Sequence, residues 1–177
     1  MIEEAIPLYN QLIDQNPYSA PYWFGLARCH FEDLNFDQAI DACDYALVGD
    51  DELTDAYVMK GLCFYQLGNE DAALECYQKA EQMHGLAPEF VYTYIGLCKV
   101  SKGEWEEGYE NLEKAIQANE AEETPAPTLP SLYANAGLCL SKMKKKRKAH
   151  QYCKKAQKLE PKDPDAYLID GRRYVEE

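Results

Sequence analysis

Cysteine and histidine are the residues in this sequence that could act as nucleophiles, redox groups or metal ligands. The chain has 177 residues, among them seven cysteines and three histidines. A structural zinc site needs three or four converging ligands, and no C-x2-C pair is present to supply two of them. An odd number of cysteines also argues against the disulfide framework of a small secreted protein. We therefore expect free thiols in a reducing compartment, and no metal or other cofactor.

The sequence carries no catalytic signature. It contains no H-E-x-x-H, G-x-S-x-G, G-x-G-x-x-G or G-x-x-x-x-G-K-[ST] motif. A reactive thiol would need a cation or a base beside it in an exposed pocket. His30 falls at an aromatic core position, His84 near a helix end, and His150 just after a basic run. We predict that the protein is not an enzyme.

The spacing of the cysteines indicates an internal repeat. Cys63, Cys98 and Cys139 each follow a glycine by two positions and end similar segments that begin with tyrosine. Two looser copies of the segment occur near the two chain ends. The small residues that anchor the five copies are Ala27, Gly61, Gly96, Gly137 and Gly171, at spacings of 34, 35, 41 and 34 residues.

Each repeat is predicted to form two amphipathic helices. A second small residue lies twelve positions beyond each of the first four anchors, and a larger residue follows four positions later. A glycine or alanine at the anchor lets the second helix approach the first closely. Gly68 and Gly103 lie seven positions beyond their anchors, where the first helix of each pair should end. The larger residues are Cys43, Tyr77, Leu112 and Cys153.

These segments resemble the tetratricopeptide repeat, whose signature is W-x2-L-G-x2-Y followed by A-x3-F and proline at a period of 34 residues. The resemblance implies an all-α fold, a right-handed superhelical solenoid of antiparallel helix pairs. We predict one array covering residues 1–177, and we expect its first helix to begin near Pro7. The predicted units are a half repeat 1–19, four repeats 20–53, 54–88, 89–129 and 130–163, and a half repeat 164–177.

In this family the first helix of each repeat lines an inner groove. The groove positions lie three before, one after and four after the anchor. Most of them are apolar here, which predicts a site for an apolar peptide or an amphipathic helix. The alternative is that they pack only against neighbouring repeats. The candidate groove residues are Phe24, Arg28, Phe31, Val58, Leu62, Tyr65, Thr93, Leu97, Val100 and Leu138.

The family's known clamp for acidic chaperone tails is missing from the groove. That clamp requires lysine, asparagine and arginine in the first helices. The first repeat has Phe24 and Arg28 at two of these positions, and the third repeat has Phe90 and Tyr94 at two others. We therefore expect an apolar ligand instead of a terminal carboxylate.

The charge is distributed unevenly along the chain. Residues 1–141 hold 6 Lys+Arg and 25 Asp+Glu, whereas residues 142–177 hold 12 and 6, for a net charge of −13. Such an acidic chain does not favour nucleic acid as its main partner. Three interpretations of the basic patch remain: a solvated turn, a contact for an acidic surface on a partner or a second copy, or a contact for nucleic acid or a membrane surface. Its residues are Lys144, Lys145, Lys146, Arg147 and Lys148.

These observations predict a non-catalytic scaffold or adaptor that binds a protein or peptide partner. The alternative is a structural oligomerisation or regulatory segment that acts through its ends or through the basic patch Lys142–Lys162. No stretch approaches 18 consecutive apolar residues, and no basic segment precedes an apolar one at the N-terminus. We therefore expect a cytoplasmic protein without membrane contact.

Overall fold

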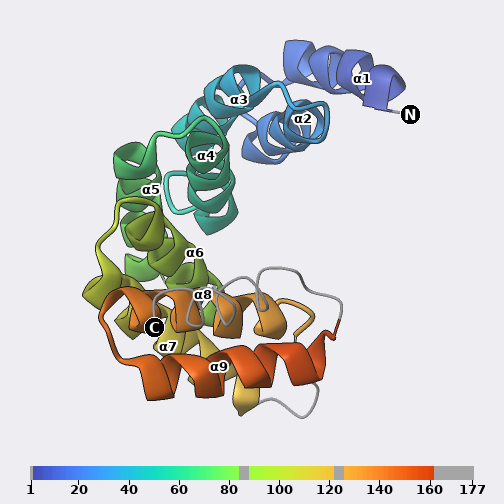
Figure 1. Ribbon diagram of the computed structural model, residues 1–177. Coiled ribbons are helices and arrows are strands. Elements are labelled where there is room, and N and C mark those ends of the chain that lie inside the picture. The colour runs from blue at the N-terminus through green and yellow to red at the C-terminus, as the bar shows by residue number, and fades with distance from the viewer. Residues whose placement is uncertain (1, 84–87, 122–125, 162–177) are drawn as a thin grey trace. The chain divides into compact units, whose positions relative to one another are not determined.

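The structure is a computed structural model that describes residues 2–83, 88–121 and 126–161 (Figure 1). All regular elements in these ranges are α-helices. The predicted half repeat 164–177 lies outside the described residues. The helices are α1 (Ile2–Gln15), α2 (Ala20–Glu32), α3 (Phe36–Gly49), α4 (Thr54–Gln66), α5 (Glu70–Gln82), α6 (Pro88–Ser101), α7 (Trp105–Glu120), α8 (Leu129–Lys142) and α9 (Lys146–Leu159).

The chain divides into two compact units, Met1–Leu86 and Ala87–Glu177, which we call the N-terminal and C-terminal units. In the N-terminal unit each of α1 to α4 packs on the next helix, and α2 also contacts α4. In the C-terminal unit α6 to α9 pack in the same sequential way, and α6 also contacts α8. Contacts restricted to near neighbours are typical of a solenoid built from helix pairs.

The small anchors allow the two helices of a pair to approach closely, as predicted. A Cβ atom added to Gly61 in α4 would lie 2.6 Å from the Tyr77 ring in α5, closer than side chains pack. The equivalent distances from added Cβ atoms are 2.8 Å from Gly96 to Leu112 and 3.0 Å from Gly137 to the Cys153 Sγ. The prediction of close helix approach at the anchors is therefore confirmed.

The turns within the four helix pairs have the same backbone geometry. In each turn one residue lies in the left-handed region, seven positions beyond the anchor. In the first turn the Asn35 N–H then donates to the His30 carbonyl at 2.8 Å, and the Asn35 carbonyl accepts the first bond of α3. Both bonds recur in the other three turns, and this pattern is a Schellman motif. The left-handed residues are Leu34 (φ 59°), Gly68 (φ 73°), Gly103 (φ 76°) and Lys144 (φ 59°).

The expected start of the first helix was wrong. Helix α1 begins at Ile2 and contains Pro7. Pro7 is the sixth residue of the helix. Its missing N–H therefore removes only one hydrogen bond, to a backbone carbonyl in the first turn. The helix is held further along by Ile13, which belongs to the core of the N-terminal unit.

Candidate functional site

The seven cysteines are buried free thiols. Burial raises the pKa of the Cys63 thiol to about 12 and that of Cys139 to about 11. Burial likewise raises the pKa of Cys43. A protonated buried thiol is a poor nucleophile, so these residues act as core side chains. In the described ranges no group of three or more His, Cys, Asp or Glu side chains could hold a metal ion.

The candidate groove positions of the N-terminal unit lie on α2 and α4, which contact each other. Arg28 is exposed, whereas Val58 is only 7% exposed and serves as a core residue. Phe24 packs against the core of this unit, although part of its ring remains accessible. The half-buried members are Phe24, Phe31, Leu62 and Tyr65. We call these four side chains the α2–α4 surface.

A pocket of about 350 Å³ adjoins the α2–α4 surface. The Phe31 ring meets the Phe36 ring edge to face, with 5.6 Å between centroids, and Phe36 lines the pocket. Leu34 and Leu67 line the pocket too, together with the polar Asn35, Asp37 and Gln38, and Leu34 is 72% exposed. Apolar side chains therefore continue from the α2–α4 surface onto the turn between α2 and α3.

The candidate groove positions of the C-terminal unit are largely occupied by packing. Leu97 and Val100 are half-buried and pack against the core of this unit. A Cβ atom added to Gly108 in α7 would lie 3.1 Å from the Val100 Cγ2, which shows how closely the two helices meet. The Thr93 hydroxyl donates to the Glu89 carbonyl at 2.7 Å, and Leu138 is half-buried.

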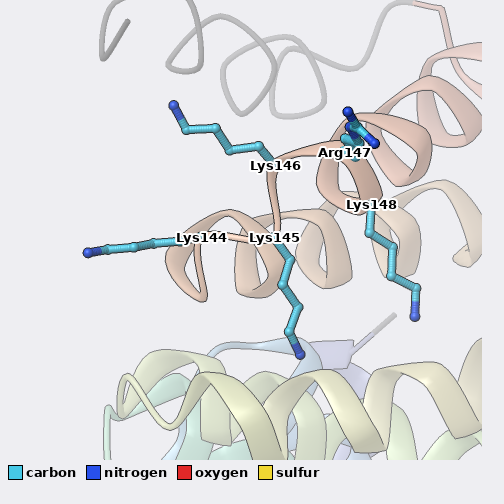
Figure 2. Close-up of a pocket in the computed structure, with 5 residues that line it drawn as sticks. All are labelled: Lys144, Lys145, Lys146, Arg147 and Lys148. Carbon is cyan, nitrogen blue, oxygen red and sulfur yellow. The ribbon is translucent and has the colours of Figure 1, made fainter.

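The basic patch lies at the turn between α8 and α9, where its residues line an open pocket of about 460 Å³. Figure 2 shows that the side chains spread in different directions: Lys145 and Lys148 extend to one side, and Lys146 to the other. Lys148 donates to the Tyr109 hydroxyl at 2.7 Å, and this hydrogen bond raises the pKa of Lys148. Its ammonium group also lies 4.9 Å from the centre of the Tyr109 ring.

A tyrosine network holds α9 against α7 and α8. The Tyr152 hydroxyl donates to Glu113 at 2.6 Å, and burial together with this bond raises the pKa of Tyr152. Lys155 donates to the Tyr133 hydroxyl at 3.0 Å and to Glu120 at 3.3 Å. Lys148 and Lys155 therefore stabilise the C-terminal unit internally.

The sequence analysis missed one pair of repeat positions. The aromatic residue four positions before each anchor contacts the residue eighteen positions beyond that anchor, on the other helix of the pair. In the first pair Trp23 stacks on Tyr45 with 4.4 Å between ring centroids, and the Trp23 indole N–H donates to the Pro17 carbonyl at 2.7 Å. The other pairs are cation–π contacts: Lys79 over Tyr57 at 5.6 Å, Lys114 over Tyr92 at 4.9 Å and Lys155 over Tyr133 at 4.7 Å. Comparing these two columns of the repeat would have found them.

Comparison with protein families supports the repeat assignment. Residues 1–80 match the family "Anaphase-promoting complex, cyclosome, subunit 3", and residues 130–163 match the family "Tetratricopeptide repeat". The signal recognition particle subunit SRP72 of Dictyostelium discoideum is 33% identical over 79 residues. That alignment spans 45% of this chain and only 11% of the relative. Among the described residues, no helix has the length and apolar character needed to cross a membrane.

Several solved structures have the same fold. The MamA structure matches with a TM-score of 0.79 and 23% identity, covering 91% of this chain and 90% of MamA. The structure of YrrB, a TPR protein with an unusual peptide-binding site, matches with a TM-score of 0.79 and 19% identity, covering 96% and 84%. The Cut9–Hcn1 structure matches with a TM-score of 0.78 and 21% identity, covering 99% of this chain and 34% of that one. With its paired helices, equivalent turns and recurrent anchors, the chain is a tetratricopeptide repeat protein with an all-α solenoid fold.

Proposed function

We propose that this protein is a non-catalytic adaptor whose α2–α4 surface binds an apolar peptide or an amphipathic helix of a partner protein. The tetratricopeptide solenoid is in general a protein–protein interaction scaffold, because stacked repeats present an extended surface. The proposal of a specific ligand depends on one observation: Phe31, Leu62 and Tyr65 stay half-buried on two helices that contact each other.

The N-terminal unit offers the better ligand site of the two. In the C-terminal unit the equivalent Leu97 and Val100 pack on the core. In the N-terminal unit the Phe31 ring contacts the Phe36 ring. Phe36 lines a pocket of about 350 Å³ that could receive one apolar side chain. An amphipathic helix would use its apolar face on this surface and insert an anchor residue into the pocket.

The test is a peptide selection followed by direct binding. Peptides selected from a random displayed library on the full chain are labelled, and their affinity is measured by fluorescence anisotropy. We expect Leu62→Lys to weaken binding at least about tenfold, because a desolvated apolar contact is replaced by a charge. Half-buried lysine can extend its amine to water, so circular dichroism should show a folded variant.

The matched control is Val48→Lys, because Val48 is 71% exposed on α3 and lies outside the α2–α4 surface. It should leave peptide affinity unchanged. Selected peptides that bind wild type and Leu62→Lys equally well would refute the proposal. A stable oligomer in sedimentation, with no selectable peptide, would instead support the alternative of an oligomerisation segment acting through its ends.

A cytoplasmic location belongs to the same proposal. It is supported by the seven cysteines, none of which forms a disulfide in the described residues, as is usual in a reducing compartment.

A further inference from the structure

The turn between α8 and α9 combines residues that do not occur together in the other three turns. The left-handed position is glycine in two turns, at Gly68 and Gly103, and Leu34 in a third, whereas the α8–α9 turn places Lys144 there with φ 59°. A left-handed conformation is unfavourable for a side chain with a Cβ atom. The next residue precedes the second helix. In the α4–α5 turn it is Asn69, whose side chain accepts from the Ala72 N–H at 3.2 Å, whereas Lys145 occupies this position before α9. Lysine cannot accept a hydrogen bond from the N-terminal amides of α9.

The first turn of α9 also has the opposite charge from its counterparts. Ten positions beyond the anchor, Asp37, Asp71 and Glu106 place a carboxylate near the N-terminus of α3, α5 and α7. Arg147 occupies that position in α9, whose first turn has no acidic residue. A carboxylate near a helix N-terminus is stabilising and a cation there is destabilising, because the N-terminal end of the helix dipole is positive.

Three cations of the basic patch are also accessible to a partner. Lys144, Lys145 and Arg147 are exposed, and they form no ion pair within the described part of the chain. Lys154 and Lys158 are exposed as well, and they share one face of α9 with Arg147. From Arg147 to Lys158 this face runs about 16 Å along the helix axis. Helix α9 contains six Lys+Arg and no acidic residue.

Lys144, Lys145 and Arg147 therefore work against local stability, and none of the three forms an ion pair within the described residues. Residues that contradict local folding rules without an internal compensation are characteristic of functional sites. We propose that the basic patch, continued by Lys154 and Lys158 on α9, is a docking surface for an acidic segment of a partner protein. This surface is independent of the proposed α2–α4 surface.

Charge distribution favours an acidic protein segment over nucleic acid as the occupant. The whole chain has a net charge of −13, which repels a long polyanion. The cations occupy a single turn and one short helix face, and the turn cations spread in different directions (Figure 2). A short segment rich in Glu and Asp can reach the pocket of about 460 Å³ and follow the basic face of α9.

The test uses a variant of the full chain, Lys144→Gly/Lys145→Asn/Arg147→Asp, which installs the residues of the Gly68 turn. The probe is a fluorescein-labelled decaglutamate peptide, followed by anisotropy at low salt. We expect the variant to bind at least about tenfold more weakly while its thermal unfolding midpoint rises by roughly 5 °C. Opposite changes in binding and stability are not expected from a merely structural turn.

The matched control is Gln11→Glu/Gln38→Glu/Gln66→Glu/Gln78→Glu, four exposed positions of the N-terminal unit. It lowers the net charge by the same four units and should keep most of the decaglutamate affinity. The proposal is overturned if the control loses as much affinity as the patch variant, or if wild type does not bind the peptide. It is also overturned if a ten-nucleotide single strand binds more tightly, or if sedimentation shows self-association that the patch variant abolishes.

Discussion

Each helix pair is held by one small residue facing one larger residue, and the two sizes compensate in the first two repeats. Gly61 faces Tyr77, the bulkiest partner, and Gly137 faces Cys153, one of the smallest. The first repeat has alanine at its anchor, Ala27, and its equivalent partner Cys43 is small. The spacing of residues in the sequence predicted both repeat positions, the small anchor and its larger partner. The sequence did not predict which candidate groove residues are exposed. Val58 is buried whereas Leu62 is not, and this difference depends on the neighbouring helices.

The compensation can be tested at Gly61. Gly61→Ala should lower the free energy of unfolding by about 1–2 kcal/mol, because overpacking of about 1–3 kcal/mol exceeds the gain in helix propensity. In Gly61→Ala/Tyr77→Cys, which copies the first repeat, the penalty of the alanine should vanish. Urea unfolding followed by circular dichroism gives the coupling energy, which we expect to be at least about 1 kcal/mol. Strict additivity of the two substitutions would contradict this account.

At the scale of elements, the four turns within helix pairs share one backbone geometry but have different residue types. Gly68 and Gly103 were recognisable in the sequence as helix ends, because glycine favours a left-handed conformation. Leu34 and Lys144 adopt the same conformation, and their residue types hide it. Only their position, seven beyond an anchor, reveals the turn. The tyrosine–lysine pairs are also hidden in a single repeat. Their equivalence becomes visible only when the repeats are aligned.

This equivalence predicts opposite effects of reciprocal substitutions. Leu34→Gly should raise the free energy of unfolding by about 1 kcal/mol, because it relieves left-handed strain at a side chain that is 72% exposed. Gly68→Ala should lower it by about 1 kcal/mol, and no atom lies within 4 Å of the added Cβ to complicate the comparison. Thermal and urea unfolding measure both. Equal signs for the two variants would rule out backbone strain as the cause.

At the scale of the whole molecule, the two units differ in charge more than in architecture. Residues 1–86 hold 3 Lys+Arg and 16 Asp+Glu, whereas residues 87–177 hold 15 of each. Each unit also has its own buried cluster, around Ile13 and Leu26 in one and around Leu112 and Tyr133 in the other. The repeat period predicted the helix pairs of the described residues, but it did not reveal where the chain divides into units.

Separate cores and unequal charge predict different responses to salt. Fragments 1–86 and 87–177 should each unfold cooperatively when expressed alone. Between 10 mM and 200 mM NaCl the unfolding midpoint of fragment 1–86 should rise by about 3–5 °C, because salt screens its self-repulsion. The midpoint of fragment 87–177 should change little. Circular dichroism at each salt concentration checks this, and equal shifts of the two fragments would contradict it.

The two tryptophans of the chain are divided between the units. Trp23 stacks on Tyr45 in the N-terminal unit, and Trp105 lies 5.8 Å from the Lys142 ammonium in the C-terminal unit. Each unit therefore carries one intrinsic fluorophore in its own surroundings. Replacing either indole by phenylalanine leaves an emission signal from a known half of the chain, so a titrated ligand can be located on one half without any attached label.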